Sequence, residues 1–273
     1  MFNFFSIYFR FTVATLKSDY FLNKYRFLVW SFSNSLSFLV QLILWSAVYS
    51  NSTQIEIHGY THNDMVLYLG ISRLIECITF SSLESHVSNA IRDGKIANSL
   101  IKPIDFRLEL LFRSFGQILG SCVLFLPFYL FVFIYFFDFH IIFHSIPPVF
   151  LLFSFIYLIY AFAINFFISL IFSCAIFITI KYIGIYQLKK TLVGLFSGAL
   201  FPISFYPKSV YILIRVLPFS YLRYYPSLAL QCKGTIQEHL IRLLIGLFWS
   251  VFLFFISNRI WHKSVSNLII FGG

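Results

Sequence analysis

The sequence predicts an all-α membrane protein that crosses the bilayer several times. Of its 273 residues, 59% are hydrophobic and 22% aromatic, whereas only 11% are charged. Soluble domains carry about 25% charged and about 45–50% apolar residues, so the chain departs from both values in the direction that lipid requires. Its 38 phenylalanines also exceed what a water-soluble domain of this length can bury. One transmembrane domain over residues 1–273 is expected.

Six apolar segments are expected to cross the membrane, because a spanning helix needs about 20 mainly apolar residues. The fourth apolar run is too long for one crossing, so we expect this helix to begin in the Pro147–Pro148 loop. The fifth begins near Thr191 and is interrupted by prolines. The other four lie at 27–49, 64–83, 113–138 and 239–257.

Residues 1–24 predict a helix that lies in the membrane surface. Asn3, Ser6, Arg10 and Lys17 recur at helical spacing among Phe, Tyr, Leu and Val. No small-residue cleavage site follows, so a secretory signal is not indicated. The alternative is a ragged start of the first spanning helix.

The net charge of +10 is distributed unevenly. With six crossings, most Lys and Arg fall on the side of the two termini, which the positive-inside rule makes cytoplasmic. This bias explains the basic composition without a nucleic-acid partner. The expected cytoplasmic group is Arg10, Lys17, Lys24, Arg26, Arg92, Lys95, Lys102, Arg107, Arg113, Lys181, Lys189, Lys190, Arg259 and Lys263. The opposite side holds Lys208, Arg215, Arg223 and Lys233.

The loop at residues 84–105 has an amphipathic pattern. Leu83, Val87 and Ala90 share one helical face, Gly94 separates two short helical pieces, and Pro103 ends the second. A short amphipathic helix at the cytoplasmic surface can dock into a groove of a soluble partner. A connector that only touches lipid headgroups is the equal alternative.

Residues 191–235 predict a broken fifth helix. Gly198 and Pro202 lie four apart in an apolar run, and proline removes a backbone donor. The stretch 210–217 is too short to span a bilayer. We therefore expect a helix that stops early, followed by short pieces that dip back into the outer leaflet. A Pro-kinked helix with an external loop is the alternative.

These features together resemble the permeases of type-two ATP-binding-cassette (ABC) exporters. The resemblance rests on the topology, the Gly94–Lys95 to Lys102–Pro103 segment, and the run from Ser197–Gly198 through Phe201–Pro202 to Tyr206–Pro207 and Leu217–Pro218. It implies a permease in a bacterial cytoplasmic membrane, with both termini cytoplasmic. The permease would pair with itself or a sister permease, form the substrate path as a dimer, and be driven by a separate ATPase subunit.

The resemblance also implies roles for particular residues. The residues that transmit ATPase closure would be Ile91, Arg92, Asp93, Gly94, Lys95 and Leu100. The external gate would include Gly198, Phe201, Pro202, Pro207 and Pro218. No G-x-x-x-x-G-K-[ST] loop occurs, so this chain is expected to bind no cofactor, with ATP and Mg²⁺ held by the partner. The polar residues Ser31, Asn34, Ser35 and Gln41 of the first segment depart from the family pattern and have no assigned role.

Arg73 and Glu76 are the ionisable pair within the second segment. They lie three apart on one helical face, and we favour mutual neutralisation over a functional role. Glu238 and Arg242, four apart, are expected to form an ordinary interfacial pair.

The remaining groups of polar residues do not indicate a metal site or a catalytic site. Two histidine pairs are expected on the external side, His58 with His62 and His140 with His144. Together they could hold a metal, but nothing in the sequence indicates that the two pairs lie close to each other. No catalytic constellation occurs, so an enzyme is not expected. A secondary transporter, which also uses broken helices, and a lipid-acting membrane enzyme are the alternatives.

Overall fold

The computed structural model describes residues 2–18, 24–94, 105–136, 146–179 and 182–266, and every regular element in these ranges is a helix. Five spans are long and apolar enough to cross a membrane, as expected of five of the six segments. They lie in α2 (Lys24–Ser50), in α3 (His62–Thr79) continued by α4 (Leu83–Arg92), and in α6 (Phe106–Phe136), α8 (Pro148–Thr179) and α12 (Ile236–Ser266).

The fifth expected segment is the exception. Helix α9 (Tyr182–Phe196) begins well before the expected start near Thr191 and has only 15 residues. Four short helices follow it: η2 (Ile203–Phe205), α10 (Lys208–Ile214), η3 (Pro218–Leu222) and α11 (Tyr224–Leu230).

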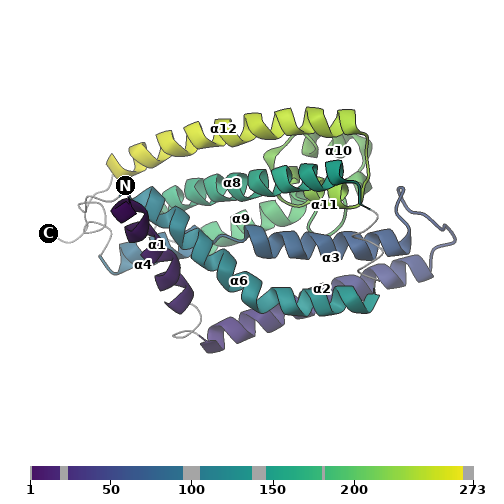
Figure 1. Cartoon of the computed structure of the whole chain (residues 1–273), viewed down its shortest axis with the longest axis horizontal. Coiled ribbons are helices and arrows are strands. Elements are labelled where there is room, and N and C mark those ends of the chain that lie inside the picture. Colours follow the sequence, from purple (N-terminus) through teal and green to yellow (C-terminus); the bar gives the residue numbers. More distant parts are fainter. Residues whose placement is uncertain (1, 19–23, 95–104, 137–145, 180–181, 267–273) are drawn as a thin grey trace.

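The long helices run side by side, and the shorter ones gather at two ends (Figure 1). Helices α1 (Phe2–Lys17) and α4 lie at the end where α12 finishes. Helices α10 and α11 lie near the opposite end, where α12 starts. Helix α8 occupies the centre and packs against α12, α4, α11 and η3.

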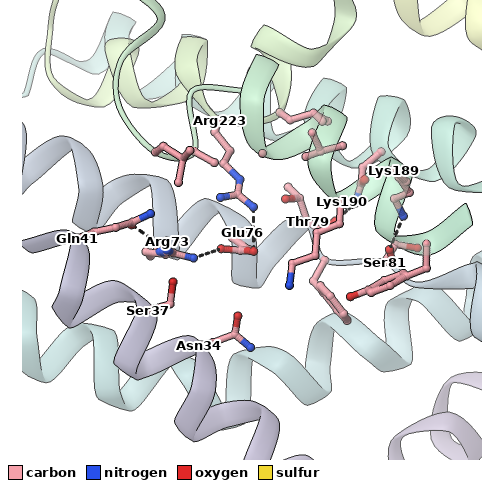
Figure 2. Close-up of a pocket in the computed structure, with 18 of the residues that line it drawn as sticks. Asn34, Ser37, Gln41, Arg73, Glu76, Thr79, Ser81, Lys189, Lys190 and Arg223 are labelled. Atoms are coloured by element: carbon pink, nitrogen blue, oxygen red, sulfur yellow. Dashed lines mark hydrogen bonds and ion pairs between the residues drawn. The ribbon is translucent and has the colours of Figure 1, made fainter. Parts of the chain in front are cut away.

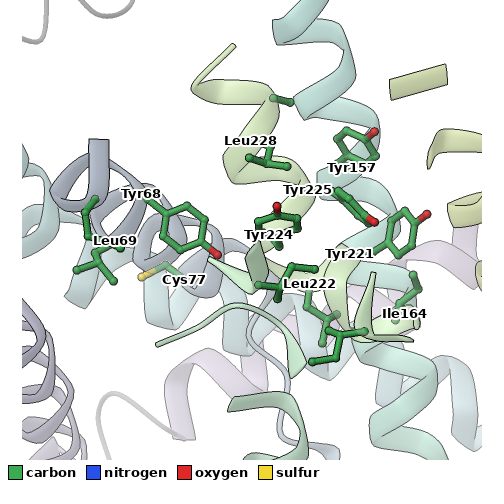
Figure 3. Packing of buried hydrophobic residues seen from close by; sticks show 14 of the residues in the cluster. Tyr68, Leu69, Cys77, Tyr157, Ile164, Tyr221, Leu222, Tyr224, Tyr225 and Leu228 are labelled. Carbon is green, nitrogen blue, oxygen red and sulfur yellow. The ribbon is translucent and has the colours of Figure 1, made fainter. Parts of the chain in front are cut away.

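The core around α8 is rich in tyrosine (Figure 3). Tyr157 of α8 stacks on Tyr225 of α11, and its hydroxyl lies 3.1 Å from Nδ1 of His239 on α12. Gly246 lets α12 come close, because a Cβ there would lie 2.7 Å from ring atoms of Tyr160 and Tyr221. Buried phenols usually find hydrogen-bond partners, and Tyr157, Tyr221 and Tyr225 have them here.

The second segment contains a break that the sequence analysis missed. Helix α3 ends at Thr79 and α4 begins at Leu83, whereas one helix was expected through residues 64–83. Side chains of other helices satisfy the freed backbone groups. The amide of Ser82 donates to Gln117 Oε1 at 2.9 Å, and Asn165 Nδ2 donates to the Thr79 carbonyl at 2.7 Å. An adjacent serine pair is a recognised position for such kinks.

Side-chain donors also satisfy backbone carbonyls in the chain after α9. Gly198 has a φ of +81°, a value that side chains disfavour, and its carbonyl accepts a bond from the Tyr68 hydroxyl at 2.6 Å. The Arg215 carbonyl at the end of α10 accepts from Tyr225 at 2.5 Å. The next carbonyl, of Val216, accepts from Trp249 Nε1 at 2.7 Å. Aromatic donors thus replace the helical bonds that this region lacks.

Helix α1 is fastened to α6 by a close backbone contact. The Thr12 hydroxyl donates to the Phe112 carbonyl at 2.8 Å, and Gly116 faces α1. A Cβ at Gly116 would lie 2.5 Å from the Thr12 carbonyl oxygen, so one backbone would have to move.

Replacing Gly116 with Ala is therefore expected to destabilise the protein by about 1–3 kcal/mol, the usual cost of overpacking. Thermal unfolding of the purified chain in detergent measures this effect. Gly184→Ala on α9 is the control, because its Cβ would meet no atom within 4 Å. Equal unfolding temperatures for the two variants would contradict the close α1–α6 contact.

Candidate functional site

A cavity of about 340 Å³ lies between α2, α3, α8 and α9 and is the candidate site (Figure 2). Its wall from α2 consists of Ser33, Asn34, Ser37 and Gln41. All four are polar, on a helix whose other exposed side chains are mostly apolar. The cavity thus accounts for Asn34 and Gln41, which had no role in the sequence analysis; Ser35 does not line it.

The expected Arg73–Glu76 pair forms and includes a third partner. Arg73 Nη1 lies 3.0 Å from one carboxylate oxygen of Glu76, and Arg223 Nη2 lies 2.8 Å from the other. Gln41 of α2 accepts a bond from Arg73 Nη2 at 2.8 Å. One carboxylate therefore joins α3 to the segment after α10, and the network lines the cavity. The sequence analysis counted Arg223 among the charges on the side opposite the termini and did not predict its pairing with Glu76.

The structure corrects the expected position of Lys189. It was counted among cytoplasmic loop residues, but it lies inside α9 and is 7% exposed. Its Nζ atom lies 2.7 Å from Oε1 of Glu84, the fully buried carboxylate of α4, and 2.6 Å from Oγ of Ser169 on α8. It also donates to the Ser81 carbonyl at 3.1 Å. The desolvated ammonium thus has three partners, whereas Oε2 of Glu84 is buried without a hydrogen-bond partner among the described residues.

Lys190 also lines the cavity instead of lying in a loop. Its side chain extends from α9 toward α2 (Figure 2). In the ranges that the structure describes, no acidic group lies within ion-pair distance of it.

The residues expected to contact an ATPase lie at the end of α4. Its inner face buries Leu83, Glu84 and Val87, whereas Arg92, Asp93 and Gly94 are exposed and Ile91 is half-buried. Gly94 has a φ of +66° and follows the end of the helix, and the second helical piece that it was expected to separate from α4 lies outside the described residues. Lys95 and Leu100 lie outside the described residues.

The expected gate residues surround the chain reversal after α9. Gly198, Pro202 and Pro218 are buried, Phe201 is half-buried and Pro207 is exposed. The Phe201 ring packs against Trp45 of α2, with centroids 6.3 Å apart. Trp45 Nε1 also donates to the Leu200 carbonyl at 3.3 Å, so α2 contacts this segment directly.

The histidine pairs that the sequence analysis considered as metal ligands are only partly within the described residues. No cluster of three or more His, Cys, Asp or Glu side chains occurs in the part of the chain that the structure describes. His62 Nε2 lies 3.1 Å from the Ser46 hydroxyl instead. His140 and His144 lie outside that part. The expected Glu238–Arg242 pair forms at 3.0 Å.

Glu76→Gln is expected to destabilise the protein, because it leaves Arg73 and Arg223 without their shared carboxylate. Removing one partner of a buried pair costs about 3–5 kcal/mol of the free energy of unfolding. Because Glu76 lines the cavity, we expect a value near the lower end of this range. Thermal unfolding measures it, with exposed Glu56→Gln as the control. Unchanged stability would refute the bridging role.

Comparison with known proteins identifies the family of the chain. A family model described as ABC-2 family transporter protein matches residues 36–272, which include four of the five spans completely, most of the first span and most of the residues that line the cavity. No curated protein and no solved structure gives a significant match. The family consists of membrane permeases that generally work with an ATPase subunit. The chain belongs to the ABC-2 transporter family and is a multi-pass membrane permease component of ABC transport.

Proposed function

We propose that this chain is the permease subunit of an ABC exporter, that it forms the substrate path as a dimer, and that a separate ATPase drives it. The observation that carries the proposal is the buried ion pair between Glu84 of α4 and Lys189 of α9. It joins the helix whose end is exposed for docking to the helix that leads into the broken segment. A displacement of α4 by the ATPase is thereby transmitted to α9.

The proposed orientation places α1, α4 and both termini in the cytosol of a bacterium. Lys and Arg are commoner near that end, as the positive-inside rule requires. The described ones there are Arg10, Lys17, Arg92, Arg107, Arg113, Arg259 and Lys263. Near the opposite end lie Lys208, Arg215, Lys233 and Arg242. Helix α9 with its short continuations supplies the sixth crossing, and α1 lies in the inner membrane surface.

In this arrangement residues 84–105 are the coupling loop and 191–235 the broken helix with its re-entrant pieces. The aromatic donors that satisfy carbonyls after α9 support this assignment, because unpaired backbone in a membrane must be covered. These pieces form the external gate. ATP and Mg²⁺ bind to the partner subunit.

The dimer contact is proposed along α2. A shallow groove on this helix is lined by Leu39, Leu42, Ile43, Ser46, Ala47 and Ser50. Small residues let membrane helices approach closely. A second copy or a sister permease seated there would bring two cavities to one interface.

Docking can be tested by co-expressing the chain with a candidate ABC ATPase subunit and measuring how much ATPase co-purifies. Arg92→Glu, at the exposed end of α4, is expected to reduce the recovered ATPase at least about fivefold, since a charge reversal at an interface costs about 1 kcal/mol or more. Lys208→Glu at the opposite end is the matched control and should leave recovery unchanged. Loss of ATPase with the control alone would invert the proposed orientation.

Coupling can be tested with the double variant Glu84→Gln/Lys189→Met. Removing both charges is expected to cost less stability than either single change, which costs about 3–5 kcal/mol, although the Ser81 carbonyl loses the donor that Lys189 supplies. Hydrogen exchange of the complex, with and without trapped ATP, should show a response in both α4 and α9 of the wild type. In the double variant most of the α9 response should be lost, and in Lys208→Met it should persist. An α9 response that survives in the double variant would contradict this coupling route.

A further inference from the structure

The cavity carries more positive than negative charge. Four basic side chains line it, Arg73, Lys189, Lys190 and Arg223, together with one acidic side chain, Glu76. Glu84, behind the wall, neutralises Lys189. Within the described part of the chain, two positive charges remain after each carboxylate has neutralised one. Uncompensated cations at membrane depth are costly, so the cavity is better suited to an anion than to an empty or apolar filling.

The donors of the cavity face one another across it. Lys190 and Arg223 approach from the side of α9 and η3, and Asn34 and Ser37 approach from α2 (Figure 2). The buried Nε atom of Arg73 has no hydrogen-bond partner among the described residues. Guanidinium, ammonium, amide and hydroxyl donors that converge in this way are the groups that bind phosphate and carboxylate. A purely structural ion network accounts for Glu76 and its two arginines, but it leaves Lys190 unexplained.

The position of the cavity indicates what else the ligand contains. On α2 the cavity is lined by positions between Ser33 and Gln41, the half of the span nearer the α1 end. Beside this polar wall, Leu36 and Val40 are exposed on the surface of α2. A molecule with an anionic head could place the head in the cavity while its apolar part remains against these side chains.

We propose that the cavity binds the anionic head, of phosphate or carboxylate type, of an amphipathic molecule whose apolar part stays in the cytosolic leaflet. As the substrate class of the transporter, this rests on the proposed function. The binding step itself requires no ATPase, so the two ideas can fail separately. Lys190 and Arg223 supply the charge, and Asn34 and Ser37 supply further hydrogen bonds.

Binding can be measured by native mass spectrometry of the full chain released from neutral maltoside micelles. The probe is dodecyl phosphate, and dodecyltrimethylammonium is the comparison with the same apolar chain. Dodecyl phosphate should bind the wild type at least about tenfold more tightly, and Lys190→Gln should weaken it about tenfold, the usual order of one charge-assisted hydrogen bond. Lys208→Gln, the same change at an exposed position outside the cavity, should bind as the wild type does.

Lys190 is exposed, so its replacement is not expected to unfold the chain. Equal binding by Lys190→Gln and the wild type, or equal binding of the two amphiphiles, would overturn the inference. Competition by phosphatidylglycerol would identify a membrane lipid phosphate as the head group, and its absence would identify a separate anionic cargo. Anion binding without ATPase association would leave this inference standing and reject only the transport proposal.

Discussion

Hydrogen bonds from side chains to interrupted backbone carbonyls hold the central part of this protein together. Two helical interruptions, at residues 80–82 and from residue 197 onward, leave polar groups that lipid cannot satisfy. At the first, Asn165 donates to the Thr79 carbonyl, and at the second, Tyr68 donates to the Gly198 carbonyl. The donors come from other helices, so each interruption also fixes the packing of its neighbours.

The cavity borders both interruptions, because Phe80, Ser81, Ala199 and Leu200 line it. Where α3 ends, Lys189 of α9 donates to the buried Ser81 carbonyl and also pairs with Glu84 of α4. The same lysine therefore satisfies backbone, neutralises a buried acid and forms part of the cavity wall. Packing, charge balance and the candidate site cannot be altered independently here.

The sequence predicted what depends on local pattern. Apolar length located five spanning helices, Gly94 indicated the end of α4, and the prolines after Gly198 indicated the short helices. It did not locate the break at residues 80–82, because three residues interrupt the apolar pattern only slightly. It also misplaced Lys189 in a loop and missed the pairing of Arg223, because their carboxylate partners are distant in the sequence and only tertiary packing brings them together. Charged residues near a segment boundary look like loop residues until such a partner is known.

The tyrosine and tryptophan donors after α9 have a further consequence for any opening of that region. A carbonyl that is hydrogen-bonded within its own helix moves together with its donor. The carbonyls of Gly198, Arg215 and Val216 instead accept hydrogen bonds from aromatic side chains of other elements. If this segment separates from those rings, only water can replace the lost donors. Hydration would then be part of the opening step itself, and a dry, half-open intermediate would be energetically unfavourable.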